Sequence, residues 1–141
     1  MKILLLIHPD AIFEKTQDAD KIRDYLGELN FAISYTTKTY TLFMYSDVYV
    51  PSHNQELYRL FRQFLSKNSL ASFDKMTMGR NLFMNDLADV IIDNPDATIV
   101  YGGGYTQHCV KDTMKNFHKI LGDIHHGDVV PMASIMFAWG T

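Results

Sequence analysis

The feature that most constrains the fold is an apolar run near the start of the sequence, KILLLIH at residues 2–8. A half-exposed strand alternates apolar and polar side chains, but this run is apolar throughout from Ile3 to Ile7. Such a run, punctuated here by Pro9, is typical of a strand that is buried in a parallel sheet. We therefore expect an α/β fold whose sheet begins with this strand.

The rest of the chain alternates between helical and strand-like patterns. Four segments place apolar side chains three and four residues apart, as amphipathic helices do, at residues 22–29, 57–65, 83–91 and 110–121. One or two strands are expected between Phe31 and Tyr49, with further strands at 97–101, which glycines break, and at 129–139. This alternation predicts one domain over residues 1–141, a three-layer, Rossmann-like α/β/α fold with a mainly parallel central sheet.

Composition narrows the expected partners. The chain has 141 residues, 47% of them hydrophobic, and a net charge of −3, which gives no basic stripe for neutralising the phosphates of a nucleic acid. No segment approaches the roughly 20 apolar residues of a membrane span, and a single cysteine fits a reducing compartment. We expect a cytoplasmic protein whose partners are a small-molecule substrate and, in a homo-oligomer, further copies of itself. No cofactor, nucleic acid or membrane partner is expected.

Residues 97–110, ATIVYGGGYTQHCV, are the segment that carries chemistry. Ligands of parallel sheets bind beyond the carboxyl ends of the strands, and consecutive glycines allow a close backbone approach there. Thr106 is expected to cap the following helix, which places Cys109 in its first turn, where the helix dipole favours the nucleophilic thiolate. The backbone amides of that turn also suit an oxyanion. The alternative is that Cys109 is a small, buried hydrophobic residue.

Nucleotide-binding motifs do not fit the glycines. A G-x-G-x-x-G fingerprint that begins at Gly102 requires a glycine where this chain has Gln107. A phosphate-binding loop requires a Gly-Lys-Ser/Thr sequence, which is absent. A flavodoxin-like nucleotide-binding domain is therefore the weaker hypothesis. A structural turn that binds no ligand remains the other alternative for these glycines.

The segment that starts at Gly103 resembles the G-x-x-T-D-x-C-V turn of the isochorismatase-like cysteine hydrolases, and Gln107 replaces the aspartate of that motif. The family's lysine, which precedes an aromatic residue and a short helix, corresponds to Lys75 in KMTMGRNLFMNDLADVI. The amino-terminal D-x-x-x-x-F motif of the family corresponds to the stretch that ends at Phe13, with His8 at the aspartate position. The resemblance spans nearly the whole chain in the same order, although this chain is shorter than most members.

The resemblance implies a hydrolase that acts on a small amide, imide or related metabolite. The family's triad of cysteine, lysine and acid corresponds to Cys109, to Lys75 with Arg80 as a substitute cation, and to a base at His8 or Asp10. An imidazole titrates near neutrality and stands at the matching position, whereas the carboxylate of Asp10 serves only if its loop bends back. Because the aspartate is missing, the alternative is a non-catalytic relative that binds a small ligand or a protein.

The resemblance also implies how the strands and the turn are arranged. It places the strand around Leu5 beside the strand around Val100, with both strands parallel. It implies a cis peptide bond after the second glycine of the turn, which orients the amides that bind an oxyanion. Substrate binding is implied for four residues around this bond, namely Gly104, Tyr105, Thr106 and His108.

Metal binding is not expected. Many members of the family have a D-x-H pattern followed by a second histidine, for which this chain has Asp47, Tyr49 and His53. A zinc site normally takes at least three protein ligands, and two remain here. His125 and His126 precede a glycine and are expected to be surface residues of a turn.

Overall fold

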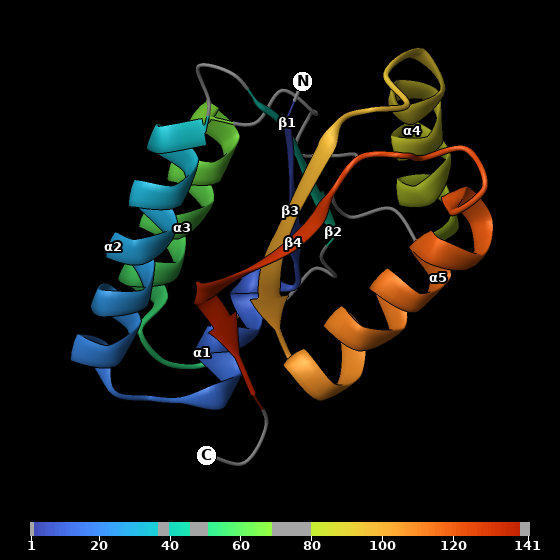
Figure 1. Ribbon diagram of the computed structural model, residues 1–141. Helices are drawn as coiled ribbons and strands as arrows, with labels where there is room; N and C mark the ends of the chain where they lie inside the picture. The colour runs from blue at the N-terminus through green and yellow to red at the C-terminus, as the bar shows by residue number, and fades with distance from the viewer. Residues whose placement is uncertain (1, 37–39, 46–50, 69–79, 139–141) are drawn as a thin grey trace.

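The computed structural model describes residues 2–36, 40–45, 51–68 and 80–138, and Figure 1 shows their arrangement. In chain order the elements are β1 (Lys2–Ile7), η1 (Pro9–Ala11), α1 (Ile12–Lys15), α2 (Ala19–Thr36), β2 (Tyr40–Tyr45), α3 (Gln55–Asn68), α4 (Arg80–Asp93), β3 (Thr98–Gly104), η3 (Thr106–Val110), α5 (Lys111–Leu121) and β4 (Val129–Phe137). The short element η1 is a 3-10 turn, and η3 is a turn of π-helix. Among the helices of this described part, none is both long and apolar enough to cross a membrane.

Within the described ranges, four strands form a parallel sheet in the order β2, β1, β3, β4. In the central pair, β1 and β3, Leu4 lies opposite Val100 and Ile7 lies opposite Gly103. This pairing confirms that the strand around Leu5 neighbours the strand around Val100 in parallel. The parallel sheet and its intervening helices confirm the α/β class.

The sheet carries an apolar core on each face, because alternate side chains of β1 point to opposite sides. Leu4 and Leu6 join the buried side chains of α2 and α3, whereas Ile3, Leu5 and Ile7 join those of α4 and α5. Figure 1 shows the same division, with α2 and α3 on one side of the sheet and α4 and α5 on the other. All five of these β1 residues are at most 1% exposed, which explains why the run lacks the alternation of a half-exposed strand.

Helix α2 is longer than expected. We expected a strand to begin near Phe31, but this residue lies inside α2, which runs to Thr36 before β2 begins. Ala32 and Ile33 are buried, and they continue the apolar stripe of α2 that includes Leu29. Packing of this stripe against the sheet therefore overrides the strand preference of the aromatic and β-branched residues around it.

The glycines do not end β3. The strand runs through all three of them to Gly104, so the expected break at Gly102 is wrong. Its neighbour β4 pairs with it on both sides of a register shift, with Pro131 opposite Tyr101 and Met136 opposite Gly103. The irregularity keeps β4 in the sheet up to Phe137.

Candidate active site

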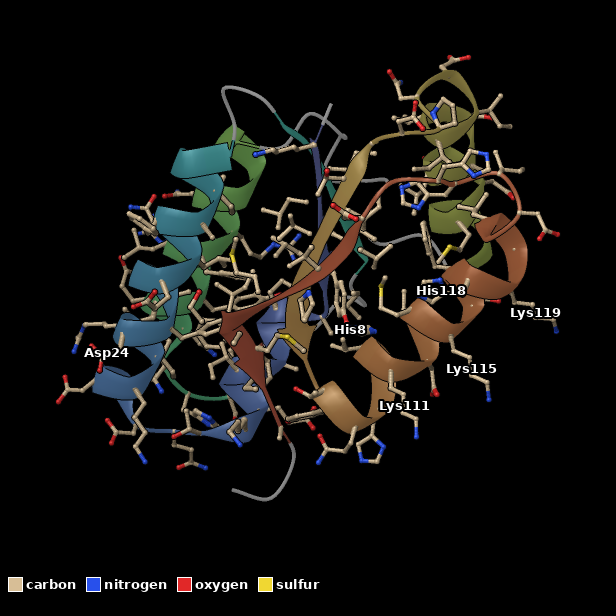
Figure 2. All side chains as sticks on the ribbon, in the orientation of Figure 1. His8, Asp24, Lys111, Lys115, His118 and Lys119 are labelled. Carbon is tan, nitrogen blue, oxygen red and sulfur yellow. The ribbon has the colours of Figure 1, made fainter. Side chains whose placement is uncertain are left out.

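The candidate base and the candidate nucleophile follow the two central strands. Ile7, the last residue of β1, lies opposite Gly103, and His8 follows it directly. Gly104 ends β3, and the η3 turn that holds Cys109 begins after one further residue. Because the strands are parallel, their carboxyl ends share one edge of the sheet, where Figure 2 shows His8. This edge is the usual position of a ligand site in a parallel sheet.

Each of the three glycines is required by a neighbouring strand. A Cβ atom on Gly102 would lie 2.5 Å from a side-chain carbon of β4, and one on Gly104 would lie 2.1 Å from Cε2 of Phe137. Gly103 has a φ of +117°, and its Cβ atom would lie 1.9 Å from the backbone oxygen of Ile7. The triplet therefore lets β1 and β4 pack closely on β3. This packing supports a structural role for the glycines.

Tyr105 ties the entrance of the turn to α1 and β4. The peptide bond between Gly104 and Tyr105 is cis, as the family resemblance implies. The tyrosine is buried, and its hydroxyl donates to Oε1 of Glu14 at 3.3 Å and lies 3.5 Å from the backbone oxygen of Ala11. Its ring packs edge-on against Phe137, with the two centroids 5.5 Å apart. The start of the turn is thereby fixed from two sides.

Thr106 does not cap the helix with its side chain, so that expectation is wrong. Its hydroxyl donates to the backbone oxygen of Phe137 at 3.1 Å, which joins η3 to the end of β4. The turn begins instead at Tyr105, whose carbonyl accepts the N–H of His108 at 3.0 Å and that of Val110 at 3.2 Å. The second bond is the wide turn of a π-helix, a form often found at functional sites.

Cys109 lies within this turn and is half-buried. It packs against the core on the α4 and α5 side of the sheet, which also contains Ile7 and Val110. Helix α5 begins two residues later, so the positive end of its dipole lies near the thiol and favours a negative charge there. The neighbouring His108 is exposed, so this part of the turn faces solvent.

His8 leaves β1 in the left-handed region, with φ 44° and ψ 51°. It is partly exposed and precedes η1, whose first residue is Pro9. This conformation ends the strand directly after Ile7 and turns the chain away from the sheet. In the view of Figure 2, His8 lies on the side of the sheet where α5 runs.

Asp10 is buried, with 5% of its surface exposed, and its charge acts on Tyr25. Burial raises the pKa of Tyr25, and the negative charge of Asp10 raises the pKa of that tyrosine further. Tyr25 belongs to the core on the α2 and α3 side, where its hydroxyl donates to the backbone oxygen of Ile135 at 2.9 Å. Asp10 thus acts on a residue of this core, whereas Cys109 packs against the other one.

The described residues contain part of the expected triad. They bring the segments of His8 and Cys109 to one edge of the sheet, and the charge of Asp10 acts on Tyr25. Lys75, the expected cation, lies outside the described residues. Arg80, its substitute, is the first residue of α4.

His53 contacts the backbone near α1. Its Nε2 atom lies 3.3 Å from the backbone oxygen of Phe13, and its Nδ1 atom lies 3.2 Å from Oγ of Ser52. Asp47 and Tyr49 lie outside the described residues. Across the described ranges, no three His, Cys, Asp or Glu side chains come together in a way that would hold a metal ion.

His125 is buried, so the expectation that it is a surface residue is wrong. Its Nε2 atom is hydrogen-bonded to the backbone oxygen of Ala97, and its ring lies edge-on to Phe117 with centroids 5.5 Å apart. His126 is exposed, as expected. The contacts of His125 fasten the loop after α5 to the start of β3.

Two polar residues near the turn were not anticipated. Glu14 accepts the hydroxyl of Tyr105, and no motif in the sequence pairs these residues. Thr113 is fully buried one helical turn after Cys109, and its hydroxyl has no hydrogen-bond partner within the part of the chain that the structure describes. Its spacing of four residues from Cys109 was the available signal, because such residues share a helix face.

Comparisons with known proteins do not assign a function to this site. No family model matches the chain, and no curated protein or solved structure matches it either. The functional conclusion therefore depends on the contacts above and on the residue pattern from Gly103 to Val110.

Proposed function

We propose that the chain is a cysteine-dependent hydrolase of the isochorismatase-like type, acting on a small amide, imide or related metabolite. The fold in this proposal is the three-layer, Rossmann-like arrangement of that family. The observation that carries the proposal is the parallel pairing of Ile7 with Gly103, because it puts His8 and the turn of Cys109 at one edge of the sheet. A nucleophile and its base must meet in this way for acyl transfer.

Each residue has a distinct role in this proposal. Cys109 is the nucleophile, and the amino-terminal end of α5 supports its thiolate. His8 accepts the thiol proton, and Lys75 adds positive charge to the site. Backbone amides of the turn bind the oxyanion. The substrate lies against the turn residues Gly104, Tyr105, Thr106 and His108.

The reaction balances with water as the only co-substrate. His8 takes the proton from Cys109, and the thiolate sulfur forms a bond to the carbonyl carbon of the substrate. The C–N bond then breaks, and the protonated His8 gives its proton to the leaving nitrogen. Water attacks the resulting thioester, the C–S bond breaks, and the carboxylic acid leaves as the thiol is restored.

In this proposal His8 is the base, and the charge of Asp10 acts on Tyr25 instead. Asp10 is buried where its charge acts on Tyr25, in the core on the α2 and α3 side. Cys109 packs against the core on the α4 and α5 side. With His8 as the base, the neutral thiol transfers its proton to the neutral imidazole, and the two groups become an ion pair. In the family, by contrast, the base is a carboxylate anion beside a lysine.

A non-catalytic role is the second candidate, and one observation favours it. All three glycines at the end of β3 are accounted for by close contacts with β1 and β4, so their presence requires no ligand. The protein would then keep the fold and bind a small molecule or a protein at the same edge. The reactivity of Cys109 separates the two candidates.

The test is to trap the acyl-enzyme. The protein is mixed with an activated ester such as p-nitrophenyl acetate, and the intact mass and the modified peptide are measured by mass spectrometry. The proposal predicts a transient acetyl group on Cys109, its absence in Cys109→Ala, and amine release from small amides by the native chain alone. Acetylation confined to surface lysines, with equal amide turnover by Cys109→Ala, would contradict it.

A further inference from the structure

The outer face of α5 carries a row of positive charge. Lys111, Lys115 and Lys119 recur every four residues and are all exposed, while the opposite face of the helix is buried. Figure 2 shows these lysines along the outer side of α5, with His118 beside them. The net charge of −3 did not indicate this stripe, but the spacing of the three lysines within residues 111–119 aligns them on one face of the helix. We call these three lysines the α5 row.

The outer face of α2 carries the opposite charge at the same spacing. Asp20, Asp24 and Glu28 recur every four residues and are exposed, and we call them the α2 row. Phe31 lies on the same helix face as this row and is 69% exposed. An exposed aromatic residue in a charged helix face is typical of a surface that contacts another protein.

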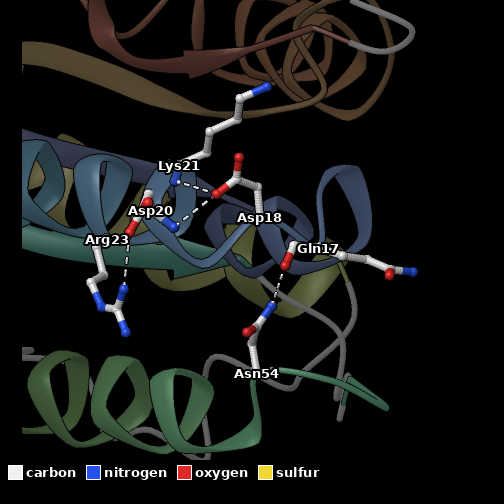
Figure 3. Close-up of polar contacts among 6 residues, drawn as sticks. All are labelled: Gln17, Asp18, Asp20, Lys21, Arg23 and Asn54. Atoms are coloured by element: carbon white, nitrogen blue, oxygen red, sulfur yellow. Dashed lines mark hydrogen bonds and ion pairs between the residues drawn. The ribbon is translucent and has the colours of Figure 1, made fainter.

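The two rows cannot pair within one chain. Figure 1 shows α2 and α5 on opposite sides of the sheet. Asp20 is paired with Arg23 of its own helix at 3.1 Å (Figure 3), and Lys21 also lies beside the α2 row. For the α5 row, the structure records no ion pair with any residue that it describes. The positive row is therefore available to a surface of another molecule.

We propose that the α5 row docks on the α2 row of a second copy of this chain. An antiparallel packing places Lys111 against Glu28, Lys115 against Asp24, and Lys119 against Asp20. The charges of each row span about 12 Å along its helix, so all three pairs form in one register. Antiparallel packing also aligns the two helix dipoles favourably.

This contact joins two different surfaces, so it is heterologous and leaves one row open at each end. It therefore builds a ring or a short chain of copies, and a closed two-fold dimer would need a different surface. Exposed ion pairs are individually weak and are screened by salt. The association is accordingly weak and strongest at low ionic strength.

The test uses charge exchange between the rows. Sedimentation velocity of the native chain is measured at about 0.02 M and about 0.5 M salt, where screening lengths differ several-fold. We expect concentration-dependent association at low salt that is lost at high salt. Lys115→Glu and Asp24→Lys should each weaken it by about tenfold or more, because each replaces an attraction with a repulsion. The double variant Lys115→Glu/Asp24→Lys should restore it.

Two controls complete the design. Asp89→Lys changes an exposed aspartate on α4 by the same charge as Asp24→Lys and should leave the association unchanged. A mixture of the two single variants should also regain the association, because native rows meet at one contact and the exchanged rows meet at the other. A native chain that stays monomeric at low salt, or a double variant that fails to associate, would contradict the proposal. Binding to vesicles of phosphatidylserine and phosphatidylcholine by a chain that stays monomeric would also contradict it.

Discussion

The backbone oxygen of Ile7 lies 1.9 Å from the point where a Cβ atom on Gly103 would stand. The backbones of β1 and β3 therefore meet more closely at the carboxyl edge than any side chain on Gly103 permits. The same glycine has a φ of +117°, which residues with a side chain rarely adopt. The close approach of β1 and β3, which positions both His8 and the turn of Cys109, thus depends on one glycine.

Gly103→Ala should destabilise the protein. The added methyl group meets backbone atoms that cannot rotate away, and the positive φ adds strain, so we expect a loss of about 3 kcal/mol in the free energy of unfolding. Urea unfolding followed by circular dichroism measures this loss. Gly27→Ala is the matched control, because Gly27 lies within α2 with nothing within 4 Å of an added Cβ atom. The control should gain about 0.5–1 kcal/mol, and equal effects at the two positions would contradict this account.

Tyr25→Phe should change how stability depends on pH. Burial, reinforced by the charge of Asp10, raises the pKa of Tyr25 above its ordinary value of 10.0. Above pH 10 the unfolded chain therefore releases this proton while the folded chain keeps it, so the free energy of unfolding falls as the pH rises. The variant should lose about 1–2 kcal/mol at pH 7, because the backbone oxygen of Ile135 loses its donor. Its stability should then fall less steeply above pH 10, and an unchanged slope in chemical denaturation would show that Tyr25 is not the group responsible.

The parts of the fold that depend on neighbours in sequence were predictable from the sequence. The run from Ile3 to Ile7 is buried on both faces, and a continuous apolar run is the direct sign of that environment. The glycine triplet was predicted to break β3, because glycine disfavours strands when only neighbours in sequence are considered. Its actual requirement comes from Ile7 and Phe137, which are distant in sequence and meet the glycines only after folding.

In the candidate site, too, local features were predictable from the sequence, and contacts between distant residues were not. Cys109 was predicted to lie in the first turn of a helix because the motif and the apolar spacing are local, and it lies in the η3 turn that leads into α5. Thr106 was predicted to bond within its own turn, but its hydroxyl donates to Phe137, 31 residues away in sequence. Asp10 and His8 are two residues apart, and only the folded chain reveals that the charge of Asp10 acts on Tyr25. Local sequence patterns predict where a loop lies, whereas tertiary contacts determine which partner each of its side chains has.

His8→Ala should abolish hydrolysis, whereas Asp10→Asn should retain most of it. The imidazole is the proposed proton acceptor for Cys109, while Asp10 lies in the surroundings of Tyr25 and its amide variant keeps a similar shape. The measurement is amide hydrolysis by each variant, with thermal unfolding to confirm that both are folded. His8→Asp, which recreates the carboxylate of the family motif, should recover part of the activity. Full activity in His8→Ala together with an inactive, folded Asp10→Asn would reverse the assignment.

The proposed nucleophile is tested by the rate at which iodoacetamide alkylates Cys109, measured against pH in the native chain and in His8→Ala. An ordinary thiol, with a pKa of about 8.5, reacts slowly at pH 7 because little thiolate is present. If the amino-terminal end of α5 and His8 both support the thiolate, the native chain reacts faster at pH 7 than a free thiol. In His8→Ala the rise in rate then moves to higher pH. A folded chain whose Cys109 does not react, or reacts only above about pH 8.5 with or without His8, would contradict the claim.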